Sequence, residues 1–128
     1  MQVLNNEALI SDAEARQFAN HWIEAWNSHD VDRIMAHYAD DVLYQSPLIA
    51  QRGFSERGQL NGIEQVREYV TRVLPNYPDL RFELSGVATG VHSVVIFYRN
   101  VARDVRAAET FVLDDEGKAV EVRCHYFS

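Results

Sequence analysis

The first third of the chain has the apolar spacing of two helices. Apolar residues recur three or four positions apart between residues 15 and 26, which places them on one helix face. The preceding SDAE at residues 11–14 is a capping box, in which Ser11 is the N-cap and Glu14 reaches back to its backbone N–H. A second, short helix is predicted after Asp30, and its inner face is expected to carry Val31, Ile34, Met35 and Tyr38.

The pattern then changes to alternation. Residues 42–46 (VLYQS) alternate so that Ser46 lies on the same side as Tyr44, which predicts a short strand. Residues 47–60 contain two glycines and predict a loop long enough to cover a cavity. A third helix is predicted to begin at Asn61, with Glu64 as its capping partner, and to end before Pro75.

The rest of the chain predicts an antiparallel meander. Residues 80–84 alternate, Gly86 indicates a bulge or a bend, and the nearly continuous apolar run VHSVVIFYRNV is typical of a strand buried on both faces. Two further strands are expected at residues 104–113 and 118–127, joined by a turn. Helices followed by antiparallel strands predict an α+β domain with helices on one face of a curved sheet, and the absence of a linker predicts a single domain over residues 1–128.

Composition limits the partners and the compartment. Hydrophobic residues make up 47% and charged residues 24% of the chain, as in an ordinary globular domain. A net charge of −7, with 19 acidic against 12 basic residues, argues against a nucleic-acid or anionic-membrane surface. The lone Cys124 cannot form an internal disulfide, and the N-terminal MQVLNNEALI has no basic region or long apolar run. We therefore expect no signal peptide, no membrane span and a cytoplasmic location.

The order of these elements resembles the nuclear transport factor 2-like superfamily, and within it the SnoaL-like group. The resemblance is carried by WIEAWNSHDVDRIMAHYADDVLYQSP, GIEQVREYV, PDLRFEL and AETFVLDDEGKAV, in that order and spacing. It implies a cone-shaped, cystatin-like roll, in which a strongly bent, mostly antiparallel sheet wraps around three helices and opens at one end onto an apolar cavity. Because this superfamily hosts cyclases, isomerases, hydrolases and plain binding or dimerisation modules, the fold alone does not predict an activity.

Comparison with ketosteroid isomerase, one enzyme of the superfamily, tests a specific chemistry. That chemistry uses a proton-shuttling carboxylate at the end of the first strand, with a tyrosine and a protonated carboxylic acid that bind the enolate oxygen. By local spacing these roles fall on Ser46, Trp22 and Glu109, respectively. A serine cannot accept a proton near neutral pH without a neighbouring base, so steroid isomerisation is not expected. Trp22 retains one N–H donor.

Glu109 is therefore the main candidate for chemistry, with Ser46 as a residue that orients substrate or water. Strand alternation places Glu109 on one face with Val105, Ala107, Phe111 and Leu113. A carboxyl group in such surroundings is desolvated, which raises its pKa and suits it to act as an acid or hydrogen-bond donor. The alternative is that Glu109 forms an ion pair across the sheet with Arg99 or Arg123.

Alternation in the last strand sends Val120, Val122, Cys124 and Tyr126 to the cavity, and His125 to the outer face. Cys124 is expected to be an unreactive buried thiol. The predicted ligand-binding residues are Trp22, Trp26, Tyr38, Tyr44, Phe54, Tyr69, Phe97, Phe111, Val122, Cys124 and Tyr126. No HxxxH, HExxH or CxxC spacing occurs, so we predict neither a metal nor a cofactor.

Two functions remain open from the sequence. The first is an enzyme that acts on a small hydrophobic molecule as an isomerase, cyclase or hydrolase, with Glu109 as acid or donor. The second is a non-catalytic module that binds an apolar ligand or dimerises. The resemblance implies, for either one, a homodimer formed through the outer face of the sheet.

Overall fold

The computed structural model describes residues 9–128, so most of the N-terminal stretch examined for a signal peptide lies outside the described residues. Within residues 9–128 no helix is both long and apolar enough to cross a bilayer. The elements are α1 (Asp12–Ser28), α2 (Val31–Met35), β1 (Tyr38–Gln45), α3 (Pro47–Gln51), β2 (Gln59–Asn61), α4 (Ile63–Val73), a 3₁₀ turn η1 (Leu74–Asn76), β3 (Phe82–Gly90), β4 (Ser93–Asn100), β5 (Val105–Leu113) and β6 (Ala119–Tyr126).

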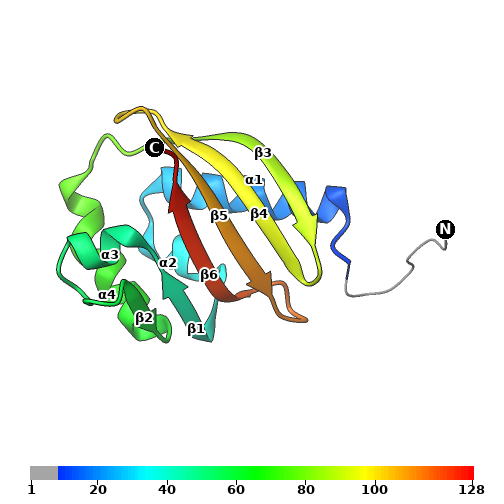
Figure 1. The fold of residues 1–128 in the computed structure, drawn as a ribbon, viewed down its shortest axis with the longest axis horizontal. Coiled ribbons are helices and arrows are strands. Elements are labelled where there is room, and N and C mark those ends of the chain that lie inside the picture. Colours follow the sequence, from blue (N-terminus) through cyan, green and yellow to red (C-terminus); the bar gives the residue numbers. More distant parts are fainter. Residues whose placement is uncertain (1–8) are drawn as a thin grey trace.

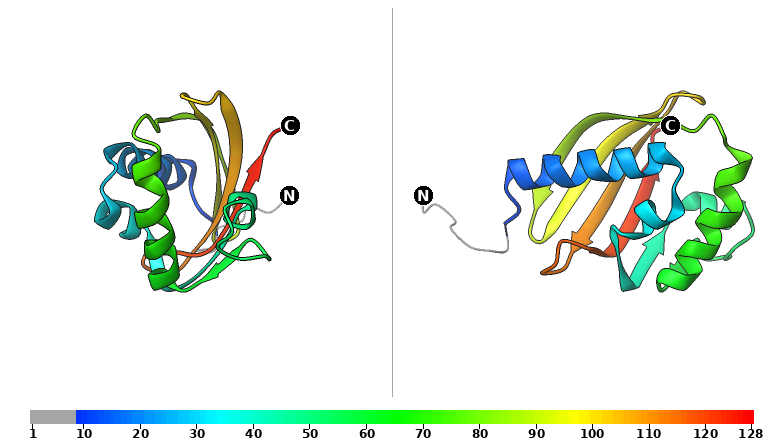
Figure 2. Two further views of the ribbon diagram at one scale, coloured as in Figure 1. Left: turned by 90° about the vertical axis from the view of Figure 1, so that its left-hand side faces the viewer. Right: turned by 180° about the vertical axis from the view of Figure 1, so that it is seen from behind.

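The predicted α+β architecture is confirmed. The described strands form a six-stranded sheet in the order β2-β1-β6-β5-β4-β3, in which every pair is antiparallel except the parallel pair β1–β6. The sheet curves around α1, and α4 covers the end of the molecule where α3 and β2 also lie (Figures 1 and 2). Strands β3 to β6 follow one another as the predicted meander.

Helix α1 starts as predicted. The Ser11 hydroxyl accepts a hydrogen bond from the backbone N–H of Glu14 at 3.1 Å, and the Glu14 carboxylate accepts one from the Ser11 backbone at 3.3 Å. Its buried face carries Ala15, Ala19, Trp22, Ile23, Ala25 and Trp26, so the helix packs into the concave side of the sheet.

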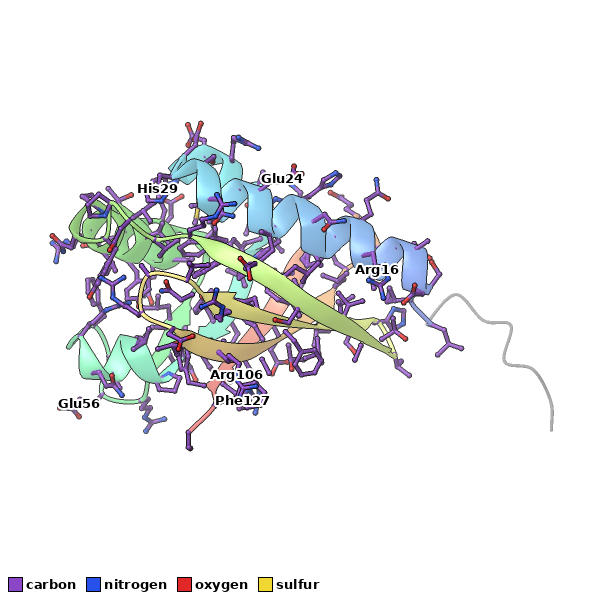
Figure 3. All side chains as sticks on the ribbon, turned by 90° about the horizontal axis from the view of Figure 1, so that it is seen from above. Arg16, Glu24, His29, Glu56, Arg106 and Phe127 are labelled. Atoms are coloured by element: carbon purple, nitrogen blue, oxygen red, sulfur yellow. The ribbon has the colours of Figure 1, made fainter. Side chains whose placement is uncertain are left out.

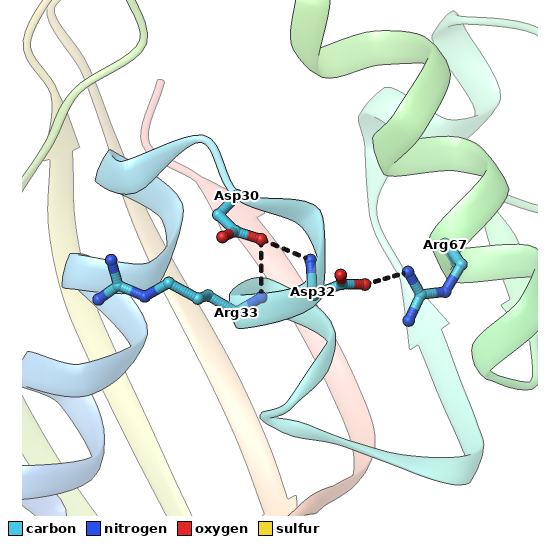
Figure 4. A network of polar contacts seen from close by, with 4 residues as sticks. All are labelled: Asp30, Asp32, Arg33 and Arg67. Atoms are coloured by element: carbon cyan, nitrogen blue, oxygen red, sulfur yellow. Dashed lines mark hydrogen bonds and ion pairs between the residues drawn. The ribbon is translucent and has the colours of Figure 1, made fainter.

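Helix α2 is capped by Asp30, whose carboxylate accepts hydrogen bonds from the backbone N–H groups of Asp32 and Arg33 at 3.0 and 3.3 Å. Asp32 also pairs with Arg67 of α4 at 2.7 Å, which links two helices that are far apart in sequence (Figure 4). Asp32 is 85% exposed and Arg67 41%, so solvent screening leaves this ion pair only a small contribution to stability. The prediction that Tyr38 lies on α2 is wrong, because the helix ends at Met35 and Tyr38 is the first residue of β1.

The segment between residues 47 and 60 is not the unstructured loop that the sequence suggested. It contains α3 and the short strand β2, which pairs with β1 in the register Tyr44–Leu60. Pro47 occupies the first turn of α3, where its missing N–H costs nothing. Both elements are too short to produce a visible apolar period.

The start of α4 also differs from the prediction. The N-cap is Gly62, at φ 88°, and no side chain caps the helix. Asn61 is the last residue of β2, and its backbone N–H donates to the Gln65 side chain at 2.8 Å. The sharp reversal from strand to helix requires a left-handed φ, which glycine adopts without strain.

Strand β4 is buried on one face rather than two. Val94, Ile96 and Tyr98 are buried, while Val95 and Phe97 are half-buried on the other side. The predicted bulge near Gly86 is confirmed by a shift of register between Leu84 and Gly86.

The face of the sheet away from α1 therefore combines apolar and charged side chains. Figure 3 shows Arg106 and Phe127 on this side, with Glu24 of α1 on the opposite side of the molecule. We call this surface the outer face; its side chains include Val95, Phe97, Arg106, Ala108, Thr110, Arg123, His125 and Phe127.

Candidate functional site

A cavity of about 430 Å³ opens at the end of the molecule where α3 and α4 lie. Its inner end is formed by residues that are almost fully buried, such as Trp22 and Glu109, and its mouth by exposed or half-buried ones such as Gln51 and Arg103. The lining residues are Trp22, Trp26, Tyr44, Ser46, Leu48, Gln51, Arg52, Tyr69, Val70, Val73, Leu74, Tyr77, Leu80, Phe82, Tyr98, Asn100, Arg103, Val105, Ala107, Glu109 and Tyr126.

Glu109 is the one charged side chain among residues 9–128 that is buried, with 1% of its surface exposed. Strand β5 places it between Ala107 and Phe111 on the inner face, as alternation predicted. The Tyr98 hydroxyl of the adjacent strand β4 donates to Glu109 Oε1 at 2.7 Å. Glu109 Oε2 has no hydrogen-bond partner among the described residues.

The alternative in which Glu109 pairs with an arginine is wrong. Arg99 pairs with Asp104 at 3.0 Å and with Glu83 at 3.6 Å, and Arg123 pairs with Glu121 at 2.9 Å. Both arginines stand on the outer face, since their positions alternate with inward-facing Tyr98 and Cys124.

Burial raises the pKa of Glu109 to about 7, because the ionised carboxylate loses its hydration. The hydrogen bond from Tyr98, together with the nearby polar Cys124 and Tyr44 side chains, acts in the opposite direction and limits the rise in pKa. The Glu109 carboxyl group therefore changes between its protonated and ionised forms near neutral pH. Burial, followed by the adjacent Glu109 charge, raises the pKa values of Tyr98 and Cys124 well above their ordinary values, so both stay protonated.

Ser46 is buried at the end of β1 and lines the cavity. Its hydroxyl oxygen accepts a hydrogen bond from the backbone N–H of Leu48 at 3.3 Å and so caps α3. This cap fixes the side chain while leaving its proton free to be donated to a ligand.

The predicted aromatic residues divide into two groups. Trp22, Trp26, Tyr44, Tyr69 and Tyr126 line the cavity. The other predicted ligand-binding residues do not line it: Tyr38, Phe54, Phe97, Phe111, Val122 and Cys124.

Packing explains these six exceptions. Phe111 is fully buried against Phe18 and Trp22, with ring centroids 5.2 and 5.3 Å apart. Phe54 packs edge-on against Tyr69 at 4.9 Å, behind the cavity wall. Tyr38, Val122 and Cys124 belong to the packed core, and Phe97 lies on the outer face.

Comparison with known proteins then decides the family, because the SnoaL-like domain model matches residues 19–127. The chain belongs to the SnoaL-like domain family. A SnoaL-like protein of unknown function from Burkholderia thailandensis E264 is similar over 94% of this chain and 99% of its own, with 41% identity and a TM-score of 0.88. No curated protein matches the chain.

More distant structures share the fold alone. A protein of unknown function with a cystatin-like fold from Methylobium petroleophilum PM1 has 16% identity and a TM-score of 0.70, covering 94% of this chain and 80% of its own. SalBIII, described as an epoxide hydrolase/cyclase-like enzyme in pyran ring formation in salinomycin, has 19% identity and a TM-score of 0.68, covering 90% and 92%. Structures described as NTF2-like share this fold too.

In this SnoaL-like protein the oxyanion-binding role considered for Trp22 is not available. The Trp22 indole N–H already donates to the Tyr38 hydroxyl at 3.1 Å. The donor beside Glu109 is instead Tyr98, which the sequence analysis missed because the run VHSVVIFYRNV hid the alternation of β4. The spacing could have identified Tyr98, because it lies two residues after Ile96 and the two side chains therefore point to the same face of β4.

Four further residues at the cavity mouth were not predicted from the sequence: Arg52, Tyr77, Asn100 and Arg103. Arg52, Tyr77 and Arg103 lie in connecting segments, where no periodicity marks a side chain as facing inward, and Asn100 is the last residue of β4.

The histidines lie away from the cavity lining. His125 is exposed on the outer face as predicted, and His37 packs edge-on against Phe18 at 5.9 Å. Within residues 9–128 no group of three His, Cys, Asp or Glu side chains is arranged to hold a metal ion.

Proposed function

We propose that this SnoaL-like protein binds a small, mostly apolar molecule in its cavity and catalyses a cofactor-independent proton transfer on it, with Glu109 as the group that donates and accepts the proton. The main support for this proposal is the state of the Glu109 carboxyl group, which is buried, has a pKa of about 7, and has no hydrogen-bond partner for Oε2 among the described residues. This carboxyl group lies in a cavity lined mainly by aromatic and aliphatic side chains. A general acid or base works best when its pKa is close to the ambient pH.

The number of buried ionisable groups in the cavity limits the types of reaction that the protein could catalyse. Isomerisation and intramolecular ring closure neither gain nor lose protons overall, so one carboxyl can give a proton to one substrate atom and take one from another. Hydrolysis needs a base for the attacking water as well as an acid for the leaving group. With Glu109 as the one buried carboxyl among residues 9–128, isomerisation or ring closure fits better than hydrolysis.

A thermal-shift screen of hydrophobic metabolites followed by product analysis tests this function. We expect compounds that stabilise the wild type to stabilise Glu109→Gln as well, because the amide has the same shape. Conversion should fall roughly 10²–10⁴-fold in Glu109→Gln, the usual contribution of a general acid–base group. The control variant Glu56→Gln, at an exposed site, should convert substrate normally.

The outcomes separate the two functions. Binding without conversion by the wild type would support the alternative, a non-catalytic binding module. If no compound stabilises either protein, the cavity does not bind small molecules and the proposal is wrong.

We also propose that two copies associate through the outer face, where Val95, Phe97 and Ala108 leave apolar surface half-exposed. Phe97→Arg would place a charge in the centre of that contact and should convert a dimer to a monomer in light scattering. Arg33→Glu, at an exposed position on α2 and outside the outer face, is the control. A wild-type protein that is monomeric at high concentration would contradict this proposal.

A further inference from the structure

We propose that the mouth of the cavity recognises a carboxylate, so that the ligand is an amphipathic carboxylic acid with its apolar body inside the protein. This inference rests on the proposed function, because it names the class of molecule that occupies the same cavity.

Two guanidinium groups reach the mouth from separate parts of the chain. Arg52 follows α3, and Arg103 lies in the turn between β4 and β5. Both stack on the ring of Tyr77, with guanidinium carbons 5.0 and 4.3 Å from the ring centroid. One aromatic ring therefore holds two positive charges beside the same opening.

Arg52 has no carboxylate partner among residues 9–128. Its side chain is half-buried and donates to the Tyr69 hydroxyl at 2.7 Å, and its guanidinium group also lies over the rings of Tyr69 and Tyr77. These neutral partners fix the guanidinium plane but leave its charge uncompensated, in a protein whose net charge is −7. A planar guanidinium with free N–H groups matches a carboxylate in two parallel hydrogen bonds. Arg103 is partly neutralised by Asp79 at 3.5 Å, which makes Arg52 the principal contact.

The inner end of the cavity has the opposite character. Glu109 would repel a ligand carboxylate there, which directs an acidic ligand to place its charged end at the mouth. Three buried polar atoms of the lining have no hydrogen-bond partner among the described residues: Trp26 Nε1, Asn100 Oδ1 and Glu109 Oε2. Buried polar groups are normally satisfied. Trp26 Nε1 is a donor, Asn100 Oδ1 is an acceptor, and Glu109 Oε2 accepts when the carboxyl is ionised and can donate when it is protonated, so they suit an uncharged group such as a hydroxyl or carbonyl on the ligand.

Matched pairs of ligands test the inference. Naphthyl and cyclohexyl carboxylic acids, each paired with its primary amide, are titrated into the wild type by calorimetry at low ionic strength. We expect each acid to bind roughly tenfold more tightly than its amide, and added salt to reduce this preference because the mouth is exposed to solvent. In Arg52→Gln the acid should bind as weakly as the amide. Arg52→Lys, which keeps the charge, should retain part of the preference. Arg57→Gln, an exposed control outside the lining, should behave as the wild type does.

Each outcome has one meaning. Acids and amides that bind the wild type equally well would overturn the carboxylate inference and leave the proposed function standing. So would equal weakening of acid and amide in both Arg52 variants, since that indicates lost packing. If neither acids nor amides bind, while the metabolite screen also finds no ligand, the proposed function itself has failed.

Discussion

Replacing Glu109 by Gln should make the protein gain stability relative to the wild type as the pH rises. The pKa of this carboxyl is about 7 in the folded protein, against an ordinary value of 4.5. In this range the folded state binds more protons than the unfolded state, so the contribution of Glu109 to stability is complete below the unfolded pKa and is lost as the pH approaches the folded pKa. Between about pH 5 and about pH 8 the wild type should lose roughly 2–3 kcal/mol that Glu109→Gln does not lose.

Urea unfolding of both proteins at the two pH values measures this difference. The groups that titrate elsewhere are the same in both chains and cancel in the comparison. Glu56→Gln, at an exposed position labelled in Figure 3, should remain parallel to the wild type across the range. Parallel behaviour of Glu109→Gln would mean that Glu109 ionises normally and would remove the basis for its role as an acid.

Phe111→Ala should destabilise the protein by about 3–5 kcal/mol, the usual cost of removing a buried aromatic side chain. Phe111 is fully buried and contacts the rings of Phe18 and Trp22, so its removal leaves a space that α1 and the sheet cannot both close. Val91→Ala, at a residue that is 64% exposed and outside the outer face, should change stability by less than about 0.5 kcal/mol.

Chemical denaturation of both variants in parallel provides the measurement. A loss below about 1 kcal/mol in Phe111→Ala would show that the ring belongs to an adaptable cavity wall. That result would restore the ligand-binding role that the sequence suggested for Phe111.

Local sequence patterns predicted the features of this protein that depend on neighbouring residues. The capping box of Ser11 and Glu14, the apolar stripe of α1 and the inward orientation of Glu109 all follow from spacings of a few residues. The α+β class and the family resemblance follow from the order of such elements along the chain.

The same approach failed where elements were short or where one pattern concealed another. Helix α3 and strand β2 are too short to show a period, and the N-cap of α4 depends on a left-handed glycine rather than on a side chain. In β4 the half-buried Val95 and Phe97 are as apolar as their buried neighbours, so the sequence could not show which face is outward.

By itself, the sequence determined the longer helices and strands and that Glu109 turns toward the interior, because helix and strand periods are properties of the local backbone. The tertiary structure alone decided that Tyr98 meets Glu109 and that Arg52 and Arg103 share one opening. These contacts join residues brought together by strand register and by the path of loops, and their geometry depends on how the sheet bends around α1.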